Sequence, residues 1–243
     1  MLPMEIIKTP NLPTGKVITA ISAAPVPAVN CIPTMALPIL PPSLSTHADL
    51  QICHVGENVL VASPEVYAYY KEKLSPLGFV VLCGENKVGC TYPKDAAYNV
   101  ARIGNVAFHN LRFTEPRIVE TCKKMGVYMV HVEQGYAKCA VVPIGDSALI
   151  TADGGIARAA RAEKMDVLEI LPGHITLSGF SYGFIGGAMA LLSKDVAYCT
   201  GSLANHPSKM EIFDFLKKYG IKIEEGSIPI PIDIGSILPL QTK

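Results

Sequence analysis

The fold of this chain is decided by a stretch that recurs along it, and the clearest copy is residues 137–171, AKCAVVPIGDSALITADGGIARAARAEKMDVLEIL. This copy contains an apolar run, a Gly-Asp turn, a second apolar run, a helical stretch and a third apolar run. Short apolar runs between turn residues are typical of buried strands, and the alanine-rich stretch between the last two runs favours a helix. The pattern predicts a ββαβ unit. Its segments are 137–142, Gly145-Asp146, 148–151, about 156–164 and 167–171.

The same order of segments occurs three more times, which is the signature of a repeat architecture. The equivalent positions of the second strands are spaced by 47, 42 and 48 residues, so the loops vary in length. These positions are Val59, Val106, Ala148 and Val196. The predicted repeats cover about 47–85, 99–135, 136–172 and 187–226.

Each repeat is expected to begin with an apolar strand and to carry one helix. A glycine follows three of the helices, at the place where a left-handed residue commonly ends a helix. The expected first strands are 50–55, 99–103, 137–142 and 188–192. The expected helices are about 64–74, 115–124, 156–164 and 209–219, and the glycines are Gly78, Gly126 and Gly220.

Apolar segments remain at the two ends of the chain, Lys16–Ser22 and Ile228–Leu240. They predict a fifth unit assembled from both ends. Five units closing in a ring would remove the exposed sheet edges of an open array. We therefore expect a single α/β domain over 1–243, a five-bladed propeller of ββαβ repeats, with a proline-rich N-terminal segment at 17–46.

The composition favours a small-molecule or protein ligand over nucleic acid. Of the 243 residues, 49% are hydrophobic and 17% charged, and 21 basic residues balance 21 acidic ones. A net charge of zero gives no electrostatic basis for binding nucleic acid or an anionic membrane. The high hydrophobic fraction is also consistent with a homodimer.

The longest stretch without a charged residue, Val17–Ala48, is long enough to cross a bilayer but is broken by six prolines. No basic cluster followed by an unbroken apolar run marks a secretory signal. The seven cysteines are odd in number and form no CxxC pair, which indicates reduced thiols. We expect a cytoplasmic protein without a disulfide framework, and no cofactor is indicated.

A ring of five ββαβ units resembles the pentein fold, which is shared by guanidino-group-modifying enzymes and by a non-catalytic ribosomal anti-association factor. The resemblance covers about residues 47–240. In the enzymes, a GHxD-like segment carries the general acid/base histidine, a GxxxC-like segment carries the nucleophile, and carboxylates of a GGD-like segment hold the guanidinium.

Two of these three segments have a match here. His47-Ala48-Asp49 opens the first repeat and is similar to the HxD element, and Gly135 to Cys139 is similar to the nucleophile segment and lies in the third repeat. The separation of two repeats agrees with the family. The resemblance implies that Cys139 is the nucleophile and His47 the general acid/base. Independently of the family, the adjacent carboxylate of Asp49 is expected to orient the imidazole or to bind a cationic part of the substrate.

The third segment departs from the family. Ile185-Gly186-Gly187-Ala188 resembles the GGD segment but lacks its acids, which argues against an arginine-like substrate. The order of the segments implies a circularly permuted ring. In the unpermuted register, Gly235 to Pro239 takes the place of the nucleophile segment, Pro239 replaces the cysteine, and the chain is inactive.

The chemistry of a Cys/His pair does not depend on the family. A thiolate is the working nucleophile, and a nearby imidazolium lowers the pKa of the thiol and later protonates the leaving group. The structural alternative is a core cysteine for Cys139 and a loop histidine for His47. In the same structural alternative, Asp49 only begins a strand.

Further residues are candidates for substrate binding, each with a structural alternative. Asp95 leads into the first strand of the second repeat, which Asn99 begins, and the two residues reach the centre of the ring or form a capped turn. Asp153 either caps the third helix or borders a ligand site with the glycines that follow. Gly186 and Gly187 admit a ligand or a close backbone contact. Metal binding through His47, Asp49 and His54 is not expected, because an extended strand would place the two histidines about 20 Å apart or more.

These observations leave two alternative functions. The first is a pentein-like hydrolase or transferase that acts on a small amidine-, guanidine- or amide-bearing metabolite through Cys139 and His47. The second is a non-catalytic pentein-fold protein that binds a protein partner.

Overall fold

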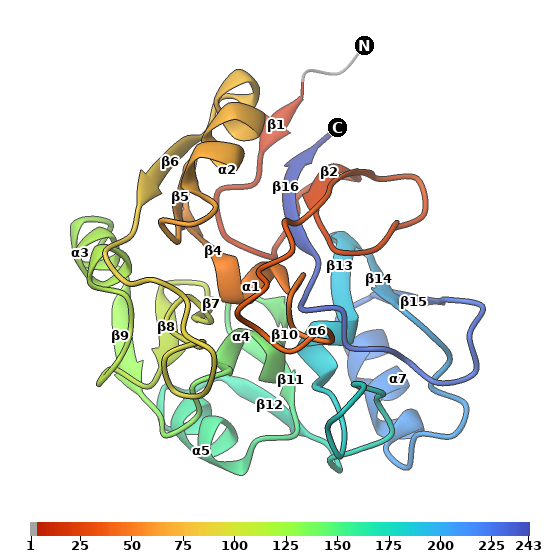
Figure 1. The fold of residues 1–243 in the computed structure, drawn as a ribbon. Helices are drawn as coiled ribbons and strands as arrows, with labels where there is room; N and C mark the ends of the chain where they lie inside the picture. The colour runs from red at the N-terminus through yellow and green to blue at the C-terminus, as the bar shows by residue number, and fades with distance from the viewer. Residues whose placement is uncertain (1–3) are drawn as a thin grey trace.

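The computed structural model describes residues 4–243, which fold into five small sheets arranged around a common centre (Figure 1). Four of the sheets have three strands each, and each is built from one continuous segment. Within each of these four, the first two strands form an antiparallel hairpin and the third pairs parallel with the second after a helix. This arrangement confirms the fold class, a five-bladed α/β propeller of ββαβ repeats.

The four continuous blades follow the predicted repeats in order. The first contains β4 (Ile52–Gly56), β5 (Val59–Ala62), α2 (Tyr67–Leu74) and β6 (Val80–Cys83). The second contains β7 (Ala101–Ile103), β8 (Val106–His109), α3 (Pro116–Lys124) and β9 (Tyr128–His131). The third contains β10 (Val141–Gly145), β11 (Ala148–Thr151), α5 (Gly154–Ala162) and β12 (Asp166–Glu169). The fourth contains β13 (Met189–Ser193), β14 (Val196–Cys199), α7 (Lys209–Lys218) and β15 (Lys222–Glu225).

The fifth sheet joins the two ends of the chain. Its order is β1 (Glu5–Ile6), β16 (Leu238–Thr242), β2 (Val17–Ile21) and β3 (Asn30–Ile32). β16 pairs antiparallel with β2, and β2 pairs parallel with β3, so β16 supplies the first strand of a blade whose other strands come from the N-terminal segment. In Figure 1 β1 and β16 accordingly lie side by side.

The ends of the helices are set by local chemistry. Pro116 begins α3, and the carboxylate of Glu115 accepts a hydrogen bond from the backbone N–H of Arg117 at 3.0 Å. Prolines are favoured at this position because the first helical N–H has no partner within the helix. The three glycines predicted to follow helices have φ between +69° and +89°, as the left-handed region requires. These glycines are Gly78, Gly126 and Gly220.

The first strands of three blades differ from the prediction at their inner ends. The expected strand starts at 50–51, 137–140 and 188 belong to three four-residue helices, α1 (Ala48–Gln51), α4 (Ala137–Ala140) and α6 (Ile185–Ala188). The prediction was wrong there because a short buried apolar run looks alike in a strand and in a helical turn. Alanine, which occurs in all three turns, is the best helix former. The three turns are buried and lie near the centre of the ring in Figure 1.

The segment 33–46 has no regular secondary structure, yet it is fixed to the ring. Its leucines, including Leu37 and Leu44, join the largest apolar cluster. The amide of Gln51 donates hydrogen bonds to the carbonyl oxygens of Met35 at 2.6 Å and Ser45 at 3.1 Å. This anchoring delivers His47 to the centre of the ring. Within the described residues, no helix is both long and apolar enough to cross a membrane.

Candidate active site

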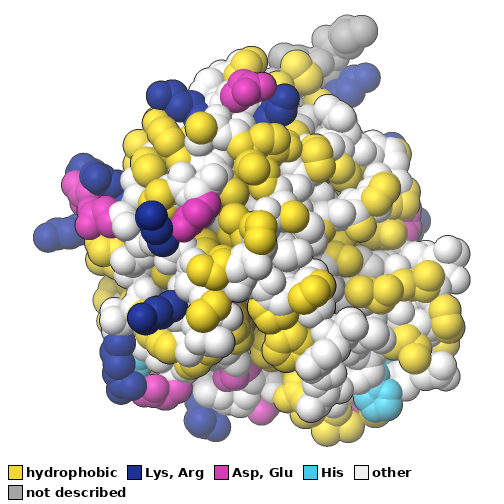
Figure 2. Space-filling view, viewed as in Figure 1, with side chains coloured by type: hydrophobic (Ala, Val, Ile, Leu, Met, Phe, Trp, Pro, Cys, Tyr) yellow, Lys and Arg dark blue, Asp and Glu magenta, His cyan; other side chains and the backbone are white. Residues whose placement is uncertain are grey.

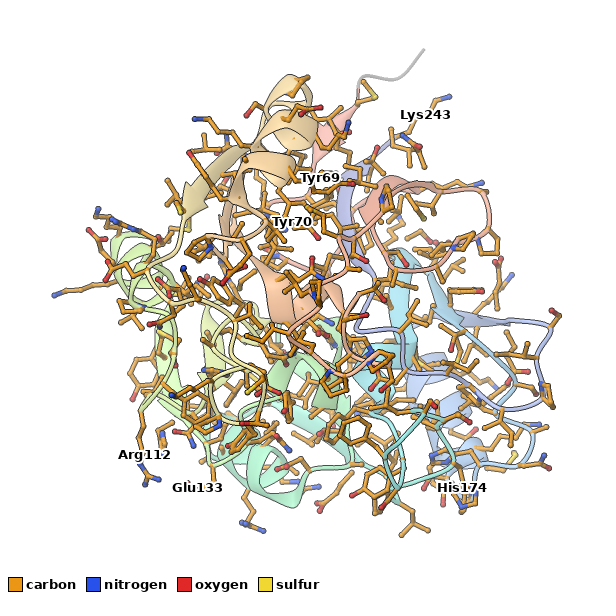
Figure 3. All side chains as sticks on the ribbon, in the orientation of Figure 1. Tyr69, Tyr70, Arg112, Glu133, His174 and Lys243 are labelled. Carbon is orange, nitrogen blue, oxygen red and sulfur yellow. The ribbon has the colours of Figure 1, made fainter. Side chains whose placement is uncertain are left out.

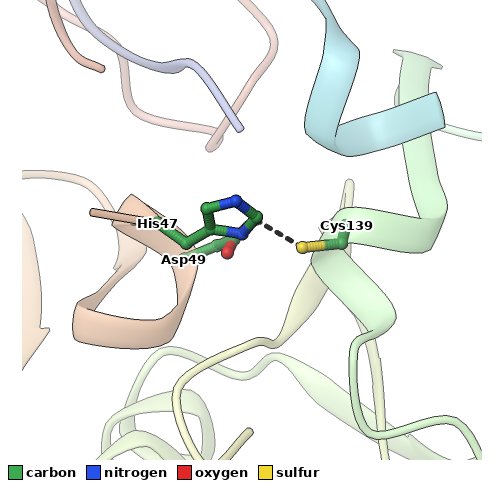
Figure 4. A group of neighbouring side chains, drawn as sticks. All are labelled: His47, Asp49 and Cys139. Atoms are coloured by element: carbon green, nitrogen blue, oxygen red, sulfur yellow. Dashed lines mark hydrogen bonds between the residues drawn. The ribbon is translucent and has the colours of Figure 1, made fainter. Parts of the chain in front are cut away.

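Three of the predicted residues meet at the centre of the ring. His47 immediately precedes α1, Asp49 lies in α1, and Cys139 lies in α4. One side-chain nitrogen, oxygen or sulfur atom from each residue lies within 4.8 Å of the others, and all three residues are buried. Figure 4 shows the imidazole of His47 and the carboxylate of Asp49 facing the sulfur of Cys139. The helical turns bring about this meeting because each turn directs a side chain inward at the start of a blade.

Cys139 is held on two sides. Its Sγ–H donates to Asp49 Oδ2 at 2.9 Å, and its backbone N–H donates to Asn99 Oδ1 at 3.0 Å. The amide nitrogen of Asn99 in turn donates to Sγ at 3.3 Å. Asn99, predicted as a substrate-binding residue, therefore clamps the cysteine through both ends of its amide.

The thiol of Cys139 is protonated in this arrangement. Burial raises its pKa well above the ordinary value, and the nearby carboxylates of Asp49 and Asp233 raise it further. In the protein without a ligand, burial first and the two acids second oppose the lowering of this pKa that an imidazolium would cause. A cationic group placed beside these acids would counter their effect on the thiol pKa.

Asp49 connects the cysteine to a buried lysine. Asp49 Oδ2 also accepts a short hydrogen bond from Ser236 Oγ, and Lys138 Nζ donates to Ser236 Oγ at 3.2 Å and to the carbonyl of Gly186 at 3.5 Å. Burial lowers the pKa of Lys138, and the charge of Asp49 opposes that shift. Ser236 belongs to the segment that resembles the nucleophile motif in the unpermuted register. Both segments that resemble the motif therefore reach Asp49.

Two polar atoms of the cluster have no hydrogen-bond partner. They are His47 Nε2 and Asp49 Oδ1, both fully buried. Buried polar atoms in native proteins are normally paired, so an unpaired one calls for an explanation such as a ligand. A nitrogen that can accept or donate a proton and a carboxylate oxygen are both left open beside the thiol.

Asp233 is a site residue that the sequence analysis missed. It is 3% exposed, and its two carboxylate oxygens accept hydrogen bonds from the backbone N–H groups of Phe184 and Gly235, both at 2.9 Å. Burial raises its pKa, and the charge of His47 opposes the shift. The sequence did contain a feature that singles it out, since Asp233 is the single charged residue between Glu225 and Lys243.

Asp233 occupies space that a glycine leaves free. A Cβ atom on Gly187 would lie 1.9 Å from Asp233 Oδ1. A Cβ on Gly186 would lie 2.2 Å from the carbonyl oxygen of Val141 and 2.7 Å from that of Cys139. The Gly-Gly pair thus lets α6 pack against α4 and lets a carboxylate from the 226–237 segment reach the centre. Positions 185 and 188 carry no acid, and Asp233, from another part of the chain, places a carboxylate near them.

A cavity of about 260 Å³ opens above this cluster. Its polar lining comes from His47, Cys139, Asp233 and Ser181, and its other walls are aliphatic or aromatic. In Figure 2 hydrophobic and uncharged side chains dominate the middle of this face, and most charged side chains lie toward its edge. The apolar lining residues are Leu44, Leu50, Tyr136, Leu177, Phe180, Tyr182 and Phe184.

The remaining predicted residues lie outside this lining. Asp95 accepts a hydrogen bond from the hydroxyl of Tyr136 at 2.7 Å, and burial raises the pKa of Asp95 while that hydrogen bond opposes the shift. Asp95 therefore stands behind a residue of the cavity wall. Asp153 caps α5 by accepting from the backbone N–H of Ile156 at 2.8 Å.

The cluster also offers ligand atoms for a metal ion. The imidazole of His47, the carboxylate of Asp49 and the thiol of Cys139 are the donor types that bind zinc. His54, which the sequence analysis considered for such a site, is directed elsewhere, since its Nε2–H donates to the carbonyl oxygen of Glu57 at 3.0 Å.

Comparison with known proteins defines the class. The fold is similar to that of SxtG, an amidinotransferase from the saxitoxin pathway of Microseira wollei, with a TM-score of 0.52, 11% identity, and coverage of 91% of this chain and 92% of that one. It is also similar to a dimethylarginine dimethylaminohydrolase adduct with S-methyl-L-thiocitrulline, with a TM-score of 0.52, 12% identity, and coverage of 82% and 75%. This chain has the pentein fold.

The sequence places the chain in a family within that class. Residues 24–238 match DUF6873, a family of unknown function, and the chain belongs to it. No curated protein sequence matches the chain.

Proposed function

We propose that this protein is a hydrolase or transferase that acts on a small amidine-, guanidine- or amide-bearing metabolite, with Cys139 as the nucleophile and His47 as the general acid/base. The observation that carries the proposal is the convergence of His47, Asp49 and Cys139, two of which, His47 and Cys139, line a cavity. The similarity to an amidinotransferase and to a dimethylarginine dimethylaminohydrolase supports it at the level of the fold.

Two carboxylates would bind the cationic head of the substrate. Asp49 has an unpaired oxygen, and Asp233 borders the cavity. An amidinium or guanidinium between them would neutralise the charges that raise the pKa of Cys139. The thiol would therefore lose its proton more easily when the cationic head is bound than in the free enzyme.

The reaction proceeds through a covalent intermediate. The proton of the Cys139 thiol passes to His47, and Sγ forms a bond with the planar amidino carbon. The bond from that carbon to the leaving nitrogen then breaks, and His47 returns the proton to this nitrogen. Water, or an amine in a transferase, next attacks the carbon and gives its proton to His47. The carbon–sulfur bond breaks, and the thiolate leaves.

The test compares two alkylating reagents of nearly equal size, cationic 2-chloroacetamidine and neutral 2-chloroacetamide. We expect the cationic reagent to label Cys139 at least about tenfold faster, because its amidinium fits between two acids. Mass spectrometry of each cysteine gives the rates. The exposed Cys83 and Cys90 serve as internal standards for the intrinsic reactivity of each reagent.

A variant locates the origin of the preference. Asp233→Asn should abolish most of the preference at Cys139, and Asp195→Asn, which changes an acid outside the cavity, should keep it. A chelator added in parallel removes any metal held by the three residues. Equal labelling of Cys139 by both reagents, with and without chelator, would overturn the proposal and favour the non-catalytic binding protein.

A further inference from the structure

The walls of the cavity carry information about the part of the substrate that does not react. Seven aliphatic or aromatic side chains line it, and its other lining residues are His47, Cys139, Ser181 and Asp233, with Asp49 hydrogen-bonded to the thiol of Cys139. A ligand whose head reaches Cys139 must therefore place its tail against apolar surface.

The aromatic part of the wall is continuous. The rings of Tyr136 and Phe184 have centroids 6.3 Å apart, and those of Phe184 and Tyr182 are also 6.3 Å apart, at 87°. Phe180 and Tyr182 are 48% and 43% exposed, although they are large side chains at the mouth of a cavity. Exposed aromatic side chains gathered around a concave site commonly bind an apolar group.

No cation is placed to bind a carboxylate on the tail. The described residues that line the cavity include neither lysine nor arginine. The buried Lys138 is bound to Ser236 and to the carbonyl of Gly186. Arg112 lies at the edge of the molecule, paired with Glu133 at 3.1 Å (Figure 3). A tail carboxylate inside the cavity would be desolvated without a partner and would also be repelled by Asp233.

We propose that the substrate carries its amidine or guanidine head on an uncharged apolar tail, aromatic or branched aliphatic, and not on an amino-acid chain. This inference rests on the proposed function, since it assumes that the head lies between Asp49 and Asp233. The tail stacks on Phe180 and Tyr182, which are the most exposed aromatic residues of the wall.

The test measures binding of four guanidines to the Cys139→Ser variant by calorimetry, and protection of Cys139 from alkylation in the parent protein. Methylguanidine probes the head alone, phenethylguanidine adds an aromatic tail, 4-(guanidinomethyl)benzoate adds a carboxylate to such a tail, and arginine has an amino-acid tail. We expect phenethylguanidine to bind at least about tenfold more tightly than each of the other three.

Variants separate the wall from the base of the cavity. Phe180→Ala and Tyr182→Ala should weaken phenethylguanidine binding several-fold and leave methylguanidine unchanged. Tyr128→Ala removes an exposed aromatic ring of β9 that does not line the cavity, and it should change neither. Ser181→Arg should strengthen binding of 4-(guanidinomethyl)benzoate relative to the parent, because it adds a cation to the wall.

The outcomes distinguish the two proposals. If methylguanidine protects Cys139 but phenethylguanidine binds no more tightly than arginine, the inference about the tail is wrong and the proposed function stands. If arginine binds most tightly, the tail is that of an amino acid. If no guanidine protects Cys139, both proposals fail together.

Discussion

Of two cavities on this molecule, the smaller one is the better candidate for a site of chemistry. The larger one, about 570 Å³, lies at the turn of the β13–β14 hairpin beside the β2–β3 loop. The smaller one, about 260 Å³, lies at the other end of the same hairpin, where α6 begins it. The larger cavity is lined by charged residues of both signs, among them Lys16, Lys194 and Asp195.

The difference lies in the state of the polar groups. Around the smaller cavity, His47 Nε2 and Asp49 Oδ1 are buried without partners. Around the larger one, Asp195 accepts a hydrogen bond from Ser193 Oγ at 2.6 Å, and that hydrogen bond lowers its pKa. None of the buried unpaired atoms among the described residues belongs to the lining of the larger cavity. Unpaired groups beside a nucleophile mark a site for chemistry better than volume does.

The largest expected effect tests this contrast directly. His47→Ala should slow alkylation of Cys139 by 2-chloroacetamidine roughly 10²-fold, since it removes the base that accepts the thiol proton. Lys194→Ala, its counterpart in the larger cavity, should leave the rate within about twofold. The rates are read from the mass of the Cys139 peptide over time. A slow Lys194→Ala variant, or a fast His47→Ala variant, would break the comparison.

The second prediction concerns histidines that are buried with their Nε2 atoms bonded to backbone. His54 Nε2–H donates to one carbonyl, and His109 Nε2–H donates to the carbonyls of Ala96 and Gly135 at 3.0 and 2.8 Å. Burial lowers the pKa of each from 6.5 to about 4. Below pH 6.5 the unfolded chain therefore takes up protons that the folded protein does not, and stability falls as the pH falls toward 4.

The expected loss is about 3 kcal/mol for each histidine between pH 6.5 and 4. Urea unfolding at several pH values measures it. His109→Gln and His54→Gln should each flatten the profile, whereas His174→Gln, a change in an exposed histidine, should flatten it less than either. Profiles that run parallel to the parent in all three variants would show that burial of these rings is not the cause.

Much of the fold could be predicted because it is periodic. The hairpins and the four long helices follow from apolar runs and turn residues that recur at similar spacings. His47 and Cys139 were identified by their resemblance to the pentein motifs, and the periodicity supports the match because each stands at the start of a repeat. The helical turns α1, α4 and α6 could not be distinguished from strand starts, because four buried residues do not define a period.

The rest of the site depends on packing between distant segments. Asp233 lies in a stretch without regular structure and reaches the centre only because Gly187 leaves room for it. The raised pKa of Cys139 depends on that same carboxylate and on Asp49. A sequence pattern records neither the contact nor the burial that gives the contact its effect.

The last prediction tests this packing with two glycines of the propeller. Gly187→Ala would place Cβ 1.9 Å from Asp233 Oδ1, so the carboxylate must move and give up its hydrogen bonds from Phe184 and Gly235. We expect a loss of about 1–3 kcal/mol in the free energy of unfolding, as is usual for an overpacked core. The preference of Cys139 for the cationic reagent should fall with it.

Gly145→Ala is the matched control. Gly145 ends β10, no atom lies within 4 Å of its added Cβ, and its φ is outside the left-handed region. The substitution should leave stability unchanged or raise it by about 0.4–1 kcal/mol through a less flexible unfolded chain. Urea unfolding and the two-reagent labelling of Cys139 are measured on both variants. A Gly187→Ala variant that keeps the full preference would mean that Asp233 does not bind the cationic head, and Asp49 would then be left as its single carboxylate partner.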